Sequence, residues 1–334
     1  MSSVNPAGLL RELSDLWVSF GKQGDSEAGT GVLRACSMTL VILAEESEDA
    51  VSLGETIAAL MPEHPARTIV VRLHGGQERS LSARVFAQCW MPFGKQQQIC
   101  CEQVEITASD AALPDLPSVV VPLAAPDLPV ILWCRSPRLL EMPEFPSVAA
   151  AAGKLVVDSL AAPSARAAVA RLAAWAANGQ LLGDLAWTRL TRWREMMAQV
   201  FENRQYLAQL PQVSSVTVAY GGDTPAAAWY MGAWLLLALE SVGVRAQFHR
   251  TREAEGRQGR LNWVELAGED FRLRLQRNEE TIVTTVDGLS HCSSLPQHAD
   301  YELMREELAI VRHDPVFEHT LASAERLAVS SSNR

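Results

Sequence analysis

A chain of 334 residues exceeds the size at which one hydrophobic core usually stops growing, so we expect two domains. The formal net charge of −10 argues against the basic face that a nucleic-acid-binding protein needs. The sequence contains no long apolar run and no basic segment followed by an apolar one at its start, so we expect neither a membrane span nor a secretory signal. Six scattered cysteines favour a cytoplasmic protein over a disulfide framework.

Residues 1–31 are predicted to form an N-terminal helix followed by a linker. Leu9, Leu13 and Trp17 recur at helical spacing. Gly21–Gly31 has the composition of a flexible linker. We therefore expect the helix to dock either on this protein or on a partner.

Residues 32–160 are predicted to form an α/β domain with a mixed sheet. Arg34–Ala44 has the pattern of a strand, and an acidic loop at Glu45–Asp49 follows it and opens a helix. Arg67–Leu73 is the next predicted strand, so the three elements form a β-α-β unit with a parallel strand pair.

The same domain contains a short apolar run, Val130–Trp133, with proline on both sides. This composition predicts a central strand that is covered on both faces. Ala83–Trp90 and Gln98–Thr107 are predicted to form an antiparallel hairpin, and Lys154–Asp158 is predicted to be a further strand.

Residues 161–325 are predicted to form a second, α+β domain. It begins with a helix at Ser164–Ala177 and a long helical segment at Asp184–Leu207. A strand at Val213–Tyr220 then leads through a turn into the apolar helix Ala226–Ser241.

Three antiparallel strands follow that apolar helix, at Leu261–Leu266, Phe271–Gln276 and Thr281–Val286. The alternation of apolar and charged residues in the middle strand predicts one solvated face, so the helices should pack on the other face of this sheet. A final helix is expected at Tyr301–His313, and residues 326–334 are expected to form a tail.

The segment Asp184–Glu195 combines tryptophan and arginine, which dominate the energetics of protein interfaces. We therefore predict that its tryptophans and arginines bind a partner; these residues are Trp187, Arg189, Arg192, Trp193 and Arg194. Two alternatives are a helix with core tryptophans and solvated arginines, and an anion site for a phosphorylated ligand.

A second candidate is the turn at Gly221, Gly222 and Thr224, with Thr224 expected to cap the helix and Pro225 to occupy its first position. A turn between a strand and a helix can bind an anion at the helix N-terminus. Because the turn lacks the glycine spacing of a dinucleotide site and a phosphate-binding lysine, an ordinary turn is the alternative.

The adjacent residues Cys100 and Cys101 are predicted to be structural thiols, with a redox-responsive thiol as the alternative. The seven histidines show no zinc-site spacing, so we expect no metal. The sequence also lacks a nucleophile elbow and a dinucleotide fingerprint, so we expect no catalytic residue and no cofactor.

Several segments in colinear order resemble the glucose-6-phosphate dehydrogenase assembly protein family (OpcA). The resemblance is carried by Arg34–Leu43, His64–Val71, Gln98–Ile106, Leu116–Arg135, Val156–Ser159 and Asp184–Glu195. It implies a protein that binds glucose-6-phosphate dehydrogenase, assists its oligomeric assembly and raises its activity in the oxidative pentose phosphate pathway. For cyanobacterial relatives it also implies that thiol redox state tunes this effect.

We therefore predict a cytoplasmic, non-enzymatic protein of two domains, each a mixed sheet packed with helices. Its predicted role is that of an allosteric activator and assembly factor of glucose-6-phosphate dehydrogenase, without nucleic-acid or membrane binding. The alternative is a sugar-phosphate-binding sensor or enzyme that uses the turn at residues 221–224 as its anion site.

Overall fold

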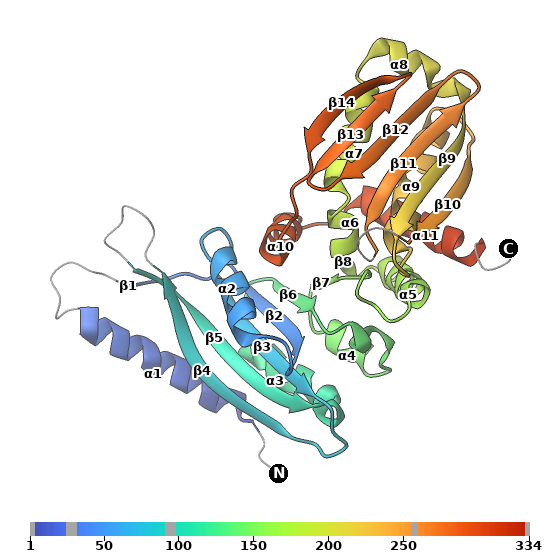
Figure 1. Ribbon diagram of the computed structural model, residues 1–334. Helices are drawn as coiled ribbons and strands as arrows, with labels where there is room; N and C mark the ends of the chain where they lie inside the picture. The colour runs from blue at the N-terminus through green and yellow to red at the C-terminus, as the bar shows by residue number, and fades with distance from the viewer. Residues whose placement is uncertain (1–3, 25–31, 91–97, 255–258, 331–334) are drawn as a thin grey trace. The chain divides into compact units, whose positions relative to one another are not determined.

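The computed structural model describes residues 4–24, 32–90, 98–254 and 259–330 (Figure 1). The chain divides into two compact units. Unit 1 comprises Met1–Val157, Gln180–Gly183 and Asp300–Ala309, and unit 2 comprises Asp158–Gly179, Asp184–Ala299 and Ile310–Arg334. Each unit contains one mixed sheet packed with helices, which confirms the predicted fold class.

Unit 1 is built on an eight-stranded sheet in the order β1-β5-β3-β2-β6-β7-β8, with β4 paired to β5. The strands are β1 (Val32–Arg34), β2 (Met38–Glu45), β3 (Ala66–His74), β4 (Leu81–Trp90), β5 (Gln98–Ser109), β6 (Val130–Cys134), β7 (Lys154–Val157) and β8 (Leu181–Asp184). The pairs of β2 with β3 and β6, of β3 with β5, and of β6 with β7 are parallel, whereas β4 and β5 form the predicted antiparallel hairpin.

The expectation of one continuous strand at Arg34–Ala44 is wrong. Val32–Arg34 pairs with β5, whereas Met38–Glu45 pairs with β3 and β6. The chain therefore leaves one part of the sheet and enters another between these segments, which a continuous strand cannot do.

The helices of unit 1 are α1 (Pro6–Gly24), α2 (Ala50–Leu60), α3 (Leu116–Leu123), α4 (Phe145–Ala149) and α10 (Asp300–Ala309), with 3-10 turns η1 (Asp110–Asp115) and η2 (Pro137–Glu141). Asp49 accepts hydrogen bonds from the backbone of Val51 and Ser52 and so starts α2. In Figure 1, α2 and α3 lie on opposite faces of the sheet. Strand β6 lies between β2 and β7, and its Leu132 and Trp133 are buried, as predicted.

Helix α1 docks on this protein, along β4 and α3 (Figure 1). Leu9 and Leu13 are buried, and Trp17 Nε1 donates a hydrogen bond of 2.7 Å to the Glu102 carboxylate. The helix continues through Gly24, so the predicted linker is wrong for residues 21–24, and residues 25–31 lie outside the described ranges.

Helix α10 joins unit 1 through a buried ion pair. Lys154 Nζ on β7 lies 3.0 Å from the Glu307 carboxylate and also donates a hydrogen bond of 2.6 Å to the Glu307 carbonyl. Gly183 on β8 lies against the same carboxylate, where any side chain would overlap with it. A segment far along the chain thus contributes to this unit.

Unit 2 contains a six-stranded sheet in the order β10-β9-β11-β12-β13-β14. The strands are β9 (Val213–Gly221), β10 (Gln247–Glu253), β11 (Leu261–Gly268), β12 (Arg272–Asn278), β13 (Thr281–Val286) and β14 (Leu289–Ser294). Strands β9 and β10 are parallel, and the others pair antiparallel. The edge strands β10 and β14 are absent from the sequence-based prediction.

The helices of unit 2 are α5 (Ala165–Ala177), α6 (Leu185–Thr188), α7 (Thr191–Val200), α8 (Arg204–Gln209), α9 (Ala226–Ser241) and α11 (Pro315–Ser330), with a 3-10 turn η3 (Leu210–Gln212). Figure 1 shows α7 and α9 together on one face of the sheet, as predicted. The single long helix expected at Asp184–Leu207 is wrong, because the segment forms the three helices α6, α7 and α8, and Asn203 caps the last of them.

The expected final helix Tyr301–His313 is also wrong in its bounds, because it ends at Ala309 and a further helix follows. Asp314 accepts hydrogen bonds from the amides of Val316 and Phe317 and starts α11. This helix extends to Ser330, into the predicted tail. No helix in the described ranges combines the length and apolar character that crossing a membrane requires.

Candidate functional site

Both tryptophans of the predicted partner-binding segment lie in the core of unit 2. Trp187 is 3% exposed, and its ring centroid lies 5.8 Å from that of Phe317 and 6.2 Å from that of Tyr230. The Arg194 guanidinium lies 3.5 Å from the Trp187 ring centroid, within the range of a cation–π contact. Trp193 is 2% exposed. Burial leaves neither tryptophan side chain on the surface of unit 2, and partner binding by this segment stays a prediction.

The remaining arginines of the segment lie in different environments. Arg189 forms an ion pair of 2.8 Å with Asp158. Arg192 Nη1 lies 3.2 Å from the Glu195 carboxylate, and the Arg192 side chain is 38% exposed. Arg192 is therefore the residue of this segment that is best placed to meet a partner.

Asp184 is fully buried in unit 2 and joins several of its elements by hydrogen bonds. In the sequence it is visible only as the start of the tryptophan-arginine segment. Its carboxylate accepts hydrogen bonds from the Ser159 amide at 3.0 Å, the Ala186 amide at 2.9 Å and the Tyr230 hydroxyl at 2.7 Å. Burial raises the pKa of Asp184 to about 6, with a further contribution from the negative charge of Asp158, while the hydrogen bonds oppose the shift. Its helix-capping position is visible in the sequence, but its distant partners are not.

A cavity of about 40 Å³ lies beside this junction, at the end of the sheet where β11 begins and β12 ends. Arg189, Arg260 and Arg277 line it together with His298. Among the described residues, this lining contains no Asp or Glu. The cavity is thus lined by cationic side chains, of which Arg189 is paired with Asp158.

The apolar wall of the same cavity includes buried side chains of α7 and β11. Trp193 and Leu190 contribute from the tryptophan-arginine segment, and Leu261 from β11. Ala227, in the first turn of α9, also lines the cavity. Arg189 and Trp193, two of the predicted partner-binding residues, thus lie at the same cavity as the start of α9. This helix follows the predicted anion turn at residues 221–224.

The predicted anion turn at Gly221, Gly222 and Thr224 does not line this cavity but contacts its lining residue Gly259. The Gly259 amide donates a hydrogen bond of 2.7 Å to the Gly221 carbonyl, and a Cβ placed on Gly259 would lie 3.5 Å from Thr224. Gly222 has a φ of 70°, which glycine adopts readily. Helix α9 begins at Ala226 with Pro225 as its cap, so the expected capping by Thr224 is wrong.

A wider hollow of about 620 Å³ adjoins the cavity and shares Arg260, Arg277 and Gln297 with it. The rest of its described lining is polar and consists of Asn262, Asn278, Glu279, Glu280 and Thr281. The cavity and the hollow together form a candidate binding site in unit 2, with arginines in the cavity and polar side chains in the hollow.

Unit 1 has the strand order of a dinucleotide-binding sheet, because β5-β3-β2-β6-β7-β8 corresponds to the order 3-2-1-4-5-6. In such sheets the ligand binds at the carboxyl ends of the central strands, with its phosphates on a glycine-rich turn. Here the first turn is the acidic segment Glu45–Asp49. A phosphate group would therefore meet negative charge.

Arginine–carboxylate pairs occupy this end of the unit 1 sheet. Arg138 lies 2.7 Å from both the Glu45 and the Asp110 carboxylates, and its hydrogen bonds to them raise the pKa of Arg138. Arg135 pairs with Glu48 at 2.5 Å and additionally with Asp300. These contacts are satisfied within the protein, so no donor set for a pyrophosphate is evident among the described residues here.

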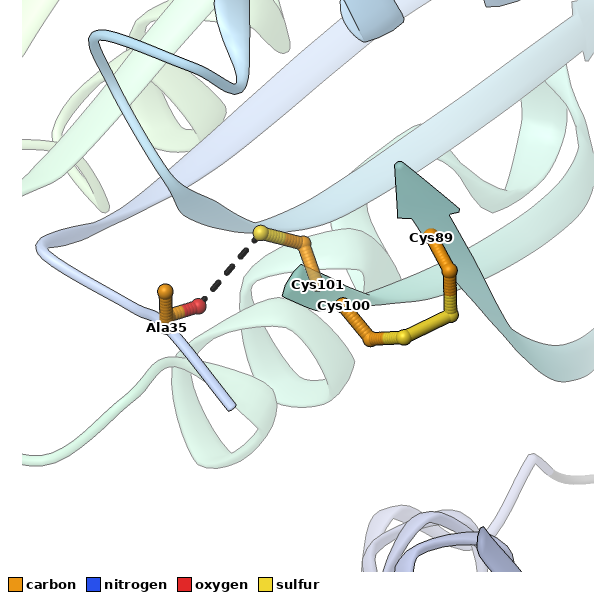
Figure 2. Close-up of a disulfide and its surroundings, with 4 residues drawn as sticks. All are labelled: Ala35, Cys89, Cys100 and Cys101. Carbon is orange, nitrogen blue, oxygen red and sulfur yellow. Dashed lines mark hydrogen bonds between the residues drawn. A yellow bond between two sulfur atoms is a disulfide. The ribbon is translucent and has the colours of Figure 1, made fainter. Parts of the chain in front are cut away.

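Cys100 forms a disulfide with Cys89 across β4 and β5 (Figure 2), so Cys100 is not the predicted structural thiol. Cys101 points to the other side of the strand, where its thiol donates to the Ala35 carbonyl at 3.4 Å (Figure 2). Burial raises the pKa of the Cys101 thiol to about 11, which fits a structural thiol. Redox responsiveness of this pair stays a prediction. The described residues include no group of three or more His, Cys, Asp or Glu side chains arranged to hold a metal.

Two protein-family models match the chain in succession. One represents the N-terminal domain of a glucose-6-phosphate dehydrogenase subunit and matches residues 57–174. The other represents the C-terminal domain of a glucose-6-phosphate dehydrogenase subunit and matches residues 180–321. The chain belongs to the OpcA family.

Two curated members of the OpcA family are similar in sequence, and both carry the name "Putative OxPP cycle protein OpcA". The Nostoc punctiforme protein is 29% identical over 180 residues, which cover 53% of this chain and 38% of that protein. The Synechocystis protein is 26% identical over 192 residues, which cover 56% of this chain and 39% of that protein. The matched region is thus less than half the length of these relatives.

In fold, this OpcA-family chain is similar to a 3-ketoreductase from Actinomadura kijaniata in complex with NADP and TDP-benzene. The TM-score is 0.50 with 12% sequence identity, and the match covers 87% of this chain and 96% of that chain. At this identity the similarity concerns the fold alone.

Proposed function

We propose that this OpcA-family chain is a non-catalytic assembly factor and allosteric activator of glucose-6-phosphate dehydrogenase, which it binds directly in the cytoplasm. The observation that carries the proposal is the succession of two family matches, both to domains of a glucose-6-phosphate dehydrogenase subunit. The names of the curated relatives place them in the OxPP cycle, which fits the same pathway.

The end of the unit 1 sheet supports a role without catalysis. A nucleotide-dependent oxidoreductase with this strand order needs phosphate donors at the first turn. This chain instead has Glu45 and Glu48 there, paired with Arg138 and Arg135. The ion pairs at this end of the sheet therefore support a role without a nucleotide cofactor.

Activation by binding sets a thermodynamic condition on the complex. A partner shifts an enzyme toward its active conformation or oligomer only if it binds that state more tightly than the other. On the OpcA-family chain, the Arg192 side chain is 38% exposed, more than the 21% of Arg189 in the same predicted set. We therefore propose that Arg192 belongs to the contact surface.

The proposal is tested by mixing the full chain with the cognate dehydrogenase. We expect co-elution in gel filtration and a higher kcat or a higher fraction of the assembled oligomer in the same samples. Arg192→Ala should weaken co-elution, whereas Arg272→Ala, at an exposed arginine on β12, should leave it unchanged. Absence of both co-elution and any change in kinetics would contradict the proposed function, as would turnover of a metabolite by the chain alone.

A further inference from the structure

The cavity in unit 2 concentrates positive charge in a protein that is acidic on average. The whole chain has 39 acidic and 29 basic residues, excluding histidine. Three arginines nevertheless converge on one small cavity whose described lining contains no carboxylate. The chemical complement of such a cavity is an anion.

Guanidinium groups and the size of the cavity favour a phosphate group. Arginine presents a planar fork of donors that matches phosphate oxygens. Arg189 is held in place by Asp158 at 2.8 Å, and a guanidinium has further N–H donors beyond that pair. The volume of about 40 Å³ equals the space of about three water molecules, close to that of the three terminal oxygens of a phosphate monoester.

Helix α9 adds a second feature that favours negative charge. Its first turn reaches the cavity at Ala227, and its cap, Pro225, makes no side-chain hydrogen bond to the helix. The first amides of a helix carry partial positive charge and lack partners within the helix. The 16-residue helix α9 therefore directs its positive end toward the same place as the arginines.

The adjoining hollow determines what the phosphate would be attached to. Its volume of about 620 Å³ lies within the range of small-molecule sites. Its described lining offers amide, carboxylate and hydroxyl groups and no aromatic side chain on which a base could stack. Such a lining suits the hydroxyl groups of a sugar or polyol better than a nucleobase.

We propose that unit 2 binds a phosphorylated, polyhydroxylated small molecule, with its phosphate among Arg189, Arg260 and Arg277 and its hydroxyl-bearing part in the adjoining hollow. Binding at this site does not require the proposed contact with the dehydrogenase. It also replaces the turn at residues 221–224 as the anion site of the chain.

Isothermal titration of the full chain, without the dehydrogenase, tests the proposal. Glucose 6-phosphate serves as the probe, with inorganic phosphate and glucose as its two parts. We expect saturable binding of glucose 6-phosphate, weaker binding of inorganic phosphate and none of glucose. Equal affinities for glucose 6-phosphate and inorganic phosphate would overturn the assigned ligand class, and no binding at millimolar concentration would overturn the site.

Variants locate the binding. Arg277→Gln should weaken the binding of glucose 6-phosphate at least about tenfold, because a hydrogen bond to a charged group is lost. Arg272→Gln, on the same strand but outside the cavity, is the matched control and should bind as the wild type does. Equal losses in both variants, or none in Arg277→Gln, would contradict the location.

A second variant, at an exposed position, keeps the site testable if Arg277→Gln does not fold. Asn278 is exposed and lines only the hollow, so Asn278→Ala should fold normally. It should weaken glucose 6-phosphate binding and leave inorganic phosphate binding unchanged. If it changes neither, the placement of the hydroxyl-bearing part is wrong. Because the dehydrogenase is absent, failure here leaves the proposed function untouched.

Discussion

The carboxylate of Asp184 connects three parts of unit 2 that are distant in sequence. It accepts hydrogen bonds from Ser159 after β7, from Ala186 in α6 and from Tyr230 in α9. Its negative charge is nevertheless unfavourable there, because burial and the nearby Asp158 raise its pKa to about 6. A neutral group with the same shape would keep most of these contacts without that cost.

Asp184→Asn is expected to change the pH dependence of stability. Because the folded-state pKa of about 6 lies above the ordinary value of 3.8, the folded protein binds more protons than the unfolded chain between these values. The contribution of Asp184 to the free energy of unfolding therefore falls as pH rises from about 4 to about 6, by on the order of 3 kcal/mol. Asp184→Asn has no carboxylate to ionise at this position, so its free energy of unfolding does not include this loss.

Urea denaturation of both proteins at several pH values measures the effect. The free energy of unfolding of Asp184→Asn, relative to that of the wild type, should increase between about pH 4 and about pH 7 and remain constant above it. Titration of other groups is common to both proteins and cancels in the difference. A constant difference across the whole range would mean that Asp184 is ionised at all these pH values in the folded state.

The contacts of a single residue can be predicted from the sequence only where the residue it contacts is close to it in the chain. Leu190, Trp193 and Met197 recur at helical spacing in the sequence, and all three are buried. The disulfide between Cys89 and Cys100 and the contact of Asp184 with Tyr230 join residues that no spacing rule connects. Arg260 and Arg277 likewise reach the same cavity because β11 pairs with β12, which their positions in the sequence do not show.

At the scale of elements, two helical glycines offer a matched comparison. Gly232 in α9 packs against Phe248 of β10, and a Cβ at this position would overlap with the Phe248 ring. Gly54 in α2 has no atom within 4 Å of the position that a Cβ would take. Both lie inside helices, so both alanine substitutions gain the same helix propensity.

Gly54→Ala should therefore raise the free energy of unfolding by about 0.5–1 kcal/mol. Gly232→Ala should lower it by about 1–3 kcal/mol, because the ring of Phe248 must move out of its packed position. Thermal and urea unfolding of the two variants and the wild type measure whether each substitution raises or lowers the free energy of unfolding. A stabilising effect of Gly232→Ala would show that α9 and β10 are packed less closely than the structure indicates.

Elements with one buried face are the ones that sequence patterns predict. Strands β11, β12 and β13 alternate between buried and exposed residues, and each of them is predicted. The missed strands β10 and β14 lie at the two edges of the sheet and are mostly exposed, so they carry no apolar alternation. The segment at residues 184–207 has a helical composition, but it forms three helices, and the side chain of Asn203 caps the last one.

At the scale of the whole molecule, the fold by itself does not give the function. The fold match covers most of the chain and concerns a ketoreductase in complex with NADP. A fold can carry unrelated functions, and the function depends on the residues of the site. In this OpcA-family chain the turn after β2 is the acidic segment Glu45–Asp49, which is visible in the sequence.

The full chain is therefore expected not to bind NADP or NADPH. Carboxylates at the first turn repel the pyrophosphate, and the ion pairs of Arg138 with Glu45 and Asp110 would have to break to admit it. A ligand that binds the folded state raises Tm as its concentration exceeds its Kd. We expect no rise in Tm with either nucleotide, with the NADP-binding ketoreductase as the positive control. A saturable rise would show that unit 1 has kept cofactor-binding capacity, and the non-catalytic role would then have to be abandoned.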